Sequence, residues 1–315
     1  MLVIHFTADR GDARLRLDQV LVRRITQVSG MSRARAQRWI AEGLVSVNRT
    51  PAARASMHVR EGTAVEVDLP NRSRIRERAA AEPVPLDVLY EDDALMAVNK
   101  PAGMVVHPTF RNPSGTLLNG VLWRVRNRKD IRPGLVSRLD KDTSGVVVVA
   151  LSSGVHARIQ RDVHAARVIK EYLAIVRGTP RPLEGRIALP LRRDPADRRR
   201  VIADPAGVPS ETMYSVIANG GGYSLVSCRL GTGRTHQIRV HLAATGSPIA
   251  GDRTYGSPDP VIQRQALHAW RVTFPHPQSR QVVTIEAPVP DDICCAWRDP
   301  LQLLLLTPGV LFSKK

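Results

Sequence analysis

The first 70 residues alternate between helical and strand-like patterns. Apolar residues recur every three to four positions over residues 17–25 and again over 36–40, on either side of a Ser29-Gly30 break. Ser32 is placed to cap the second helix, and Gly43 is placed to end it. Alternating runs, which predict strands, follow at residues 44–48 and 64–69. The pattern predicts a small module of two helices and at least two strands.

The remainder of the chain is richer in strand patterns. We expect strands within residues 88–98, 146–150, 170–178, 212–230, 267–274 and 281–287, where acidic residues or Gly220-Gly221-Gly222 provide the turns. We expect helices at 116–125, at 156–168 and within 232–246, where Gly246 ends the helix. Residues 192–200 are read as a basic loop that is short of residues that could pack. A second, larger domain therefore mixes strands with helices.

A polar, arginine-rich stretch closed by Pro83 and Pro85 separates the two patterns and is read as a linker. We expect a first domain at residues 15–70, the linker at 71–85, a second domain at 86–298 and a tail at 299–315. Within the tail, residues 301–312 are apolar, and both a docked terminal segment and a loose tail are compatible with that pattern.

The stretch at residues 138–145, Arg-Leu-Asp-Lys-Asp-Thr-Ser-Gly, leads directly into Val146-Val147-Val148-Val149-Ala150. Four of these last five residues are β-branched, as expected of a buried strand. The loop thus places the carboxylate of Asp140 at the rim of a core. Taken alone this is weak evidence for chemistry, because an Asp at such a junction usually caps or closes a turn.

Charge narrows the class of partner. The 315 residues include 46 Lys and Arg against 29 Asp and Glu, which gives a net charge of +17, and an excess of this size is typical of proteins that bind polyanions. Codon composition can explain the choice of Arg over Lys, but it does not explain the excess. An anionic membrane is disfavoured because no basic amphipathic helix with an aromatic-rich face is evident. Nucleic acid is the expected partner.

The three cysteines show no disulfide or zinc spacing, and no apolar stretch of 18 residues or export signal is present. We therefore expect a cytoplasmic protein that is not exported and has no membrane partner. The histidines do not form a recognisable ligand set, and phosphate-binding and dinucleotide-binding glycine patterns are absent. We expect no metal and no cofactor.

Five motifs carry a resemblance to known families. R-L-D-x-x-L at residues 16–21 and S-R-x-x-A-Q-x-x-I-x-x-G-x-V-x-V-N at 32–48 resemble an S4-type RNA-binding domain. R-L-D-x-x-T-S-G, N-K-P-x-G-M-V-V-H-P and G-R-T-H-Q-I-R-V-H-L-A-x-x-G-x-P-x-x-G-D-x-x-Y-G resemble RluA-type pseudouridine synthases over about residues 86–290. The resemblance implies an α+β fold: a catalytic domain with a mixed, mainly antiparallel sheet, preceded by a small α+β S4-like domain.

The second resemblance implies roles for three separated residues. The family's essential aspartate corresponds to Asp140, which attacks C1′ of the uridine or acts as a base at the sugar. A carboxylate in a partly desolvated pocket needs a cation beside it, and the family's partner arginine corresponds to Arg239. Tyr172 matches the tyrosine that stacks on the uracil, and its phenol is a candidate to remove the C5 proton. The alternative for Tyr172, a residue at the edge of the core, stays open.

Other residues are expected to contact RNA. Arg138 matches the residue that fills the space left by a flipped nucleotide, although Ser137 stands where the family often has His. On the S4-like helix the arginines that would bind phosphate, unless they form only a solvated face, are Arg33, Arg35 and Arg38. The further residues assigned to RNA are Lys100, Lys170, Arg234 and His236.

The sequence therefore predicts a monomeric isomerase that converts uridine in structured RNA to pseudouridine, with 23S ribosomal RNA as the favoured substrate. Two alternatives remain: a pseudouridine synthase that acts on tRNA, and a catalytically idle RNA-binding or ribosome-assembly factor. The joint presence of Asp140, Tyr172 and Arg239 argues against the idle factor.

Overall fold

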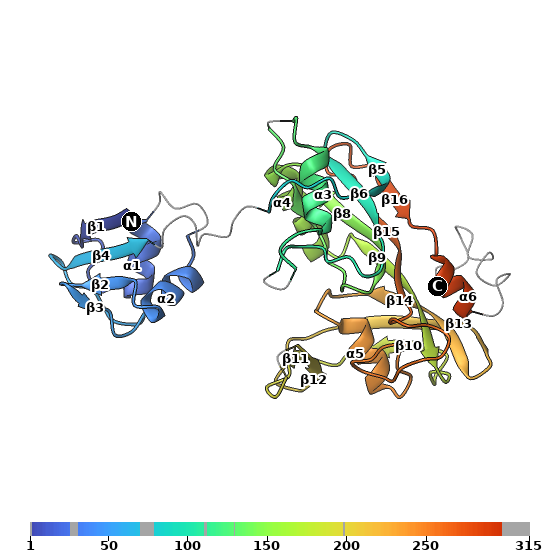
Figure 1. Ribbon diagram of the computed structural model, residues 1–315. Helices are drawn as coiled ribbons and strands as arrows, with labels where there is room; N and C mark the ends of the chain where they lie inside the picture. Colours follow the sequence, from blue (N-terminus) through green and yellow to red (C-terminus); the bar gives the residue numbers. More distant parts are fainter. Residues whose placement is uncertain are drawn as a thin grey trace. The chain divides into compact units, whose positions relative to one another are not determined.

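The computed structural model describes residues 2–25, 31–69, 79–109, 112–128, 130–197 and 199–297. The chain forms two compact units, Met1–Arg78 and Ala79–Lys315 (Figure 1). The Ser29-Gly30 break, residues 71–78 of the predicted linker and the tail predicted for 299–315 lie outside the described residues.

The first unit is a four-stranded antiparallel sheet, in the order β1-β4-β2-β3, with two helices against it (Figure 1). Its elements are β1 (Leu2–Thr7), α1 (Leu17–Arg24), α2 (Arg33–Ala41), β2 (Val45–Val47), β3 (Thr50–Pro51) and β4 (Ala64–Leu69). The two predicted helices and both predicted strands are confirmed. The strand β1, which pairs along β4, lies ahead of the expected domain start at residue 15.

The predicted helical stripes form the core of this unit. Leu17, Leu21 and Ile25 from the first stripe and Ala36 from the second are fully buried in one cluster. Ser32 caps α2 as expected, since its hydroxyl accepts a hydrogen bond from the backbone N–H of Arg35 at 3.3 Å. Packing of the two stripes against the sheet therefore accounts for the local fold.

The second unit is built on a ten-stranded mixed sheet whose main path runs β10-β13-β14-β9-β15-β8-β6-β5. Its first strands are β5 (Asp87–Glu91), β6 (Leu95–Lys100), β7 (Gly134–Leu135), β8 (Ser144–Ala150), β9 (Ile169–Arg177) and β10 (Glu184–Ile187). Its later strands are β13 (Thr212–Gly220), β14 (Tyr223–Leu230), β15 (Leu267–Pro275) and β16 (Val282–Glu286). The pair β8 and β15 is parallel and the other described pairs are antiparallel, so the predicted fold class is confirmed.

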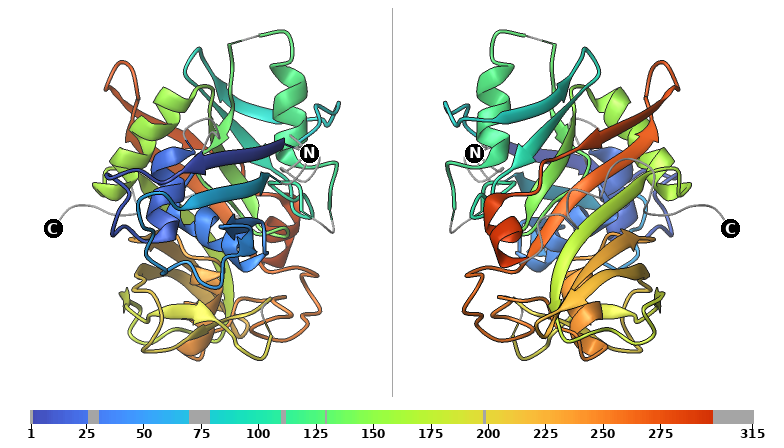
Figure 2. Two further views of the ribbon diagram at one scale, coloured as in Figure 1. Left: turned by 90° about the vertical axis from the view of Figure 1, so that its left-hand side faces the viewer. Right: turned by 90° about the vertical axis from the view of Figure 1, so that its right-hand side faces the viewer.

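The valine run forms β8 near the centre of this sheet, and both of its faces are buried. Val147 and Val149 pack with α3 (Leu117–Arg124), whereas Val146 and Val148 pack with α4 (Ser153–His164). In the side views of Figure 2 the two helices lie on opposite sides of these strands. A strand covered on both faces must be apolar at every position, which explains the unbroken run.

Two helices complete the unit: α5 (Gln237–Ala244), which packs against the β9 half of the sheet, and α6 (Asp291–Ala296), which the sequence patterns did not predict. The helix expected at 156–168 begins earlier because Ser152 caps it, and it ends at His164.

The structure corrects the expectation of a basic loop at residues 192–200. The ends of this segment form a two-stranded hairpin of β11 (Leu191–Arg193) and β12 (Val201–Ala203). Leu191 and Val201, which stand just outside this range, are buried against Val240 of α5, whereas no described residue within 192–200 is buried. The hairpin was therefore not predicted, but the shortage of packing residues within 192–200 is confirmed. The pattern was misleading because the two apolar residues stand at the ends of an arginine-rich stretch and pack on a distant helix.

Candidate active site

A cleft of about 570 Å³ opens in the second unit between three segments. These are the loop that precedes β8, the start of β9 and the turn that leads into α5. The predicted site residues that line it are Arg138, Asp140, Lys170, Tyr172, Arg234, His236 and Arg239. Residues far apart in sequence thus share one cleft.

Asp140 is held by an ion pair with α5. Its carboxylate oxygen Oδ2 accepts a hydrogen bond from Arg239 Nη1 at 2.9 Å. The other side of the guanidinium binds Asp252 through two bonds, from Nε at 2.7 Å and from Nη2 at 2.9 Å. The Asp252 side chain is fully buried, whereas that of Asp140 is 24% exposed to the cleft. Arg239 therefore links a buried carboxylate to one that a substrate can reach.

The charges in this chain of three groups support one another. Burial alone would lower the pKa of Arg239, but Asp252 and Asp140 raise it above its ordinary value. Burial would raise the pKa of Asp252, but the guanidinium of Arg239 and the backbone N–H groups of Thr254 and Tyr255 keep it low. At neutral pH the arginine is charged, which keeps a cation in place beside Asp140.

Gly251 determines how Asp252 enters the core. Its φ is +72°, and a Cβ at this position would lie 2.1 Å from the carbonyl oxygen of Arg264. Only glycine tolerates both the left-handed backbone and this approach. The turn then directs Asp252 toward Arg239.

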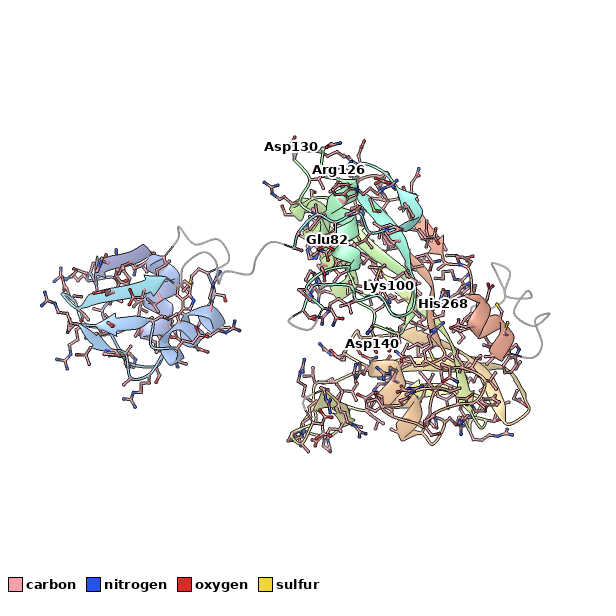
Figure 3. The ribbon with its side chains drawn as sticks, in the orientation of Figure 1. Glu82, Lys100, Arg126, Asp130, Asp140 and His268 are labelled. Carbon is pink, nitrogen blue, oxygen red and sulfur yellow. The ribbon has the colours of Figure 1, made fainter. Side chains whose placement is uncertain are left out.

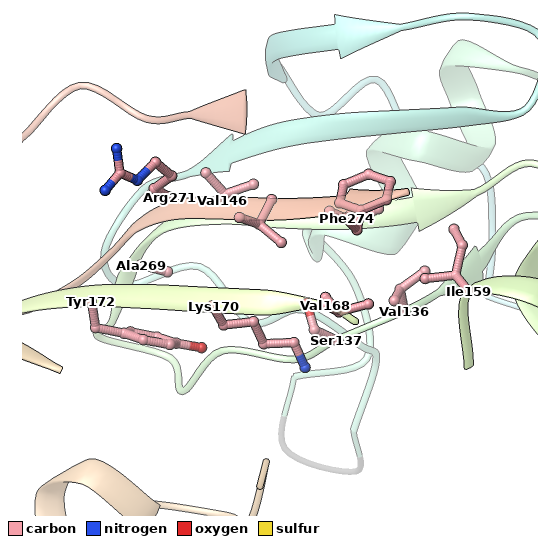
Figure 4. A pocket seen from close by; sticks show the side chains of 12 residues that line it. Val136, Ser137, Val146, Ile159, Val168, Lys170, Tyr172, Ala269, Arg271 and Phe274 are labelled. Carbon is pink, nitrogen blue, oxygen red and sulfur yellow. The ribbon is translucent and has the colours of Figure 1, made fainter. Parts of the chain in front are cut away.

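Tyr172 and Lys170 extend from the same face of β9, as strand alternation predicts (Figure 4). Tyr172 is buried and also borders a smaller cavity of about 20 Å³, which it shares with Ser137 and Lys170. Burial and the nearby Asp140 carboxylate raise the pKa of the Tyr172 phenol. The ring can present a flat surface to a base, and its hydroxyl stays protonated at neutral pH.

His236 lies beside the ion pair at the start of α5, with a φ of +55°. Its Nδ1 is 2.7 Å from the hydroxyl of Tyr255, and its Nε2 is 3.8 Å from Asp140 Oδ2. Burial lowers the pKa of His236, against the opposing charge of Asp140. The Arg239 guanidinium carbon also lies over the Tyr255 ring, 5.0 Å from the ring centroid. The Tyr255 hydroxyl accepts a hydrogen bond from the backbone N–H of Val201 in β12. These contacts connect the basic hairpin to the cleft.

Arg138 and Arg234 are exposed on the lining of the cleft. Lys170 is only partly exposed, and burial lowers its pKa. These three cations are placed to meet a polyanion that enters the cleft.

Lys100 corrects an expectation, because it was predicted to bind RNA. Its side chain is 0% exposed, and Nζ donates to the carbonyl oxygens of Pro101, Met104 and Lys141 at 2.7, 2.8 and 2.9 Å. Figure 3 labels it together with Asp140. Burial lowers the pKa of Lys100 to about 7. Its amino group is thus used inside the protein, where it joins the N-K-P turn to the Asp140 loop, and it cannot reach a phosphate.

The predicted RNA-binding arginines of the first unit lie on α2. Arg33 and Arg38 are exposed, while Arg35 is half-buried and lies over the ring of Trp39, 5.4 Å from its centroid. Arg33 also approaches the buried Asp18 of α1 at 3.4 Å.

Sequence reasoning missed Asp252 and Tyr255. Both stand in the quoted motif G-D-x-x-Y-G, so a signal was available, but nothing in the spacing indicated that the carboxylate returns to Arg239. Among the described residues, no group of three or more His, Cys, Asp or Glu is arranged to hold a metal ion. In the same part of the chain, no helix is long and apolar enough to cross a membrane.

Two family models match separate parts of the chain, one in each unit. A family model for RNA pseudouridylate synthase matches residues 94–244, and one for the S4 domain matches residues 15–65. Ribosomal large subunit pseudouridine synthase D of Nitrosomonas europaea is 40% identical over 300 residues, which are 92% of this chain and 86% of that protein. An uncharacterized RNA pseudouridine synthase of Bacillus subtilis is 37% identical over 92% of this chain and 95% of its own.

Two solved human structures share the fold of most of this chain. RNA pseudouridylate synthase domain containing 1 has a TM-score of 0.58 and 25% identity, and covers 74% of this chain and 98% of its own. RNA pseudouridylate synthase domain containing 4 has a TM-score of 0.55 and 23% identity, over 66% of this chain and 90% of that one.

Proposed function

The chain belongs to the RNA pseudouridylate synthase family and carries an S4 domain, and from this premise we propose that it converts specific uridines of large-subunit ribosomal RNA to pseudouridine. The proposal of a ribosomal substrate rests on the names of relatives such as the Nitrosomonas europaea protein. We expect the enzyme to act as a monomer.

The reaction breaks the N1–C1′ bond, turns the uracil and joins C5 to C1′. One protein group must therefore act at the sugar while the base is loose. We assign this role to Asp140, as nucleophile at C1′ or as base toward the sugar. The observation that carries the assignment is the ion pair of Asp140 with Arg239, itself held by Asp252, on the wall of the cleft. Because Asp252 anchors Arg239 from behind, the arginine can hold the Asp140 carboxylate in a fixed orientation toward the cleft.

We assign Tyr172 to stacking on the uracil during its rotation. An aromatic face holds a flat base without fixing its orientation, as the turn requires. Removal of the C5 proton by the phenolate is disfavoured, because burial and Asp140 raise the pKa of Tyr172. The hydroxyl can still pass a proton along, but it is a poor base.

The nucleotide must leave its stack before Asp140 can reach C1′, at a cost of a few kcal/mol. We assign Arg138, which is exposed in the cleft lining, to the space that the base leaves. Lys170 and Arg234 are assigned to backbone phosphates of the same RNA. His236 belongs to the RNA-facing wall of the cleft, next to the hairpin of β11 and β12. The exposed arginines of α2 are assigned to further phosphates of the RNA.

The test is release of tritium from RNA labelled at C5, because pseudouridine has the same mass as uridine. The wild-type protein should release tritium from large-subunit ribosomal RNA, and Asp140→Ala should release none above background. Asp93→Ala, which removes an exposed carboxylate on the β5–β6 turn, is the control and should keep full activity. If wild type releases no tritium from any cellular RNA, the enzymatic proposal fails in favour of an idle binding factor.

Comparison of pseudouridine maps from cells with and without the protein identifies the substrate. Loss of pseudouridine at positions in large-subunit ribosomal RNA is the expected result. Loss confined to tRNA would replace the ribosomal proposal with the tRNA alternative.

A further inference from the structure

The loop that carries Asp140 has little regular structure of its own. Residues 137–143 contain no described helix or strand, and within the loop the backbone N–H of Thr143 donates to the Asp140 carbonyl at 3.2 Å. The ion pair with Arg239 orients the carboxylate, but it does not fix the backbone on which the carboxylate stands. Support for that backbone must come from elsewhere.

Arg264 supplies such support, because it binds the Asp140 loop and helix α6 at the same time. Its Nη1 donates to the carbonyl oxygen of Asp142 at 3.1 Å and to those of Gln265 and Leu267 at 3.1 and 3.4 Å. Its Nε and Nη2 bind the Asp292 carboxylate of α6 at 2.6 and 2.8 Å. The side chain is only 11% exposed. The guanidinium therefore joins α6 to the catalytic loop two residues beyond Asp140.

The residues that follow Arg264 continue the support along the loop. Gln265 contacts the hydroxyl of Thr143 at 3.4 Å, and His268 Nδ1 lies 2.9 Å from the hydroxyl of Ser144. Gly145 has a φ of +113°, and a Cβ there would lie 2.1 Å from the carbonyl oxygen of Ala269. Residues 264–269 thus run alongside residues 142–145 and contact each of them, up to the point where β15 and β8 pair in parallel.

We propose that Arg264 is a positioning residue for the isomerisation, which holds the Asp142 carbonyl from its anchor on Asp292 and thereby sets where the Asp140 carboxylate meets the sugar. The inference rests on the function proposed above and extends it to a residue outside the cleft. Arginine suits this role because its planar fork serves a bidentate carboxylate and backbone carbonyls together. A lysine at the same place offers one nitrogen and cannot hold both partners in this geometry.

The expected effect follows from the sensitivity of catalysis to position. A displacement of about 1 Å in a reacting group costs about 100-fold in rate. Arg264 does not line the cleft, so its loss should leave the binding of RNA unchanged. A lower rate of the chemical step at unchanged RNA affinity distinguishes positioning from binding.

The experiment measures single-turnover tritium release, RNA affinity and thermal unfolding for wild type, Arg264→Met, Arg264→Lys and Asp292→Asn. Arg177→Met is the matched control, because Arg177 binds Asp259 with two nitrogens, at 2.9 and 3.1 Å, and the Pro258 carbonyl at 2.9 Å. Arg264→Met should reduce the rate constant by about 10- to 100-fold with RNA affinity within twofold. Arg264→Lys and Asp292→Asn should lose less, and Arg177→Met should keep the wild-type rate per folded molecule.

The outcomes separate this inference from the function on which it rests. If wild type is inactive, the proposed function fails first. If wild type is active and Arg264→Met retains its rate per folded molecule, Arg264 does not position Asp140. An equal loss of rate in Arg264→Met and Arg177→Met would likewise overturn the inference, because it would reveal a general effect of losing an arginine that binds both a carboxylate and a backbone carbonyl.

Discussion

The substitution Asp252→Asn tests whether the buried carboxylate controls the active site through Arg239. Asp252 accepts two hydrogen bonds from Arg239 and one each from the backbone N–H groups of Thr254 and Tyr255, at 2.9 and 3.2 Å. An Asn side chain of the same shape has one acceptor oxygen and an amide that donates. The substitution therefore removes a charge and directs a donor toward groups that only donate.

The magnitude follows from burial. Breaking a buried ion pair by removing one partner costs about 3 to 5 kcal/mol, because the other charge stays in the protein interior. Arg239 still has Asp140 after the substitution, so we expect the lower end, about 3 kcal/mol of unfolding free energy. Arg239 also loses its bidentate anchor, and the rate of tritium release should fall at least tenfold, since the aim of Asp140 depends on it.

Urea unfolding and single-turnover tritium release measure the two effects, and a double-mutant cycle with Arg239→Met isolates the pair. Because Arg239→Met leaves Asp252 charged and unpaired, the double variant should be more stable than the sum of the single losses predicts, by about 2 kcal/mol. It should remain inactive. Losses that add within about 0.5 kcal/mol, or an Asp252→Asn protein of wild-type stability, would refute the reasoning.

Two further predictions concern the first unit and the strand junction. Replacing Arg33, Arg35 and Arg38 by Gln should weaken RNA binding. The slope of log K against log salt concentration should become shallower by about 0.7 to 0.9 for each phosphate that the variant no longer binds. Affinities at several salt concentrations measure the slope, and an unchanged slope would show that the three arginines form a solvated face. Burial lowers the pKa of His268 from 6.5 to about 4. Between these two pH values the unfolded chain binds a proton at this histidine and the folded chain does not. The free energy of unfolding is therefore highest above pH 6.5 and falls by about 3 kcal/mol as the pH decreases toward 4. Unfolding of His268→Gln between pH 7 and 4 should lack this component, and an undiminished pH dependence would contradict it.

Hydrophobic periodicity and capping residues predicted most helices and strands, because the residues that determine each of these elements lie within or next to it in the sequence. The valine run could only be a buried strand, and Ser32 caps α2 through its own neighbours. The hairpin of β11 and β12 escaped prediction for the opposite reason. Its two buried residues, Leu191 and Val201, pack on Val240 of α5, which lies about 40 to 50 residues further along the chain. Elements that depend on one or two distant contacts leave too little local pattern to detect.

The same distinction separates the parts of the site. Family motifs pointed to Asp140 and Arg239, and the structure brings them to 2.9 Å. Motif letters do not say which way a side chain faces, however, and Asp252 was left without a role although it stood in the quoted pattern. Its function depends on the turn at Gly251, which directs it back to Arg239.

Lys100 and Arg264 show why net charge overstates the surface that faces RNA. Both are basic side chains beside the loop that carries Asp140, and both donate to backbone carbonyls of that loop, at Lys141 and Asp142. A basic side chain that donates to these carbonyls stabilises one conformation of a loop that contains no helix or strand. In an enzyme whose reacting carboxylate stands on such a loop, some basic side chains stabilise the loop, and only the others are available to bind RNA phosphates. Among the described residues, the basic side chains that we assign to the substrate in the cleft are the exposed or half-buried ones that line it, Arg138, Lys170 and Arg234.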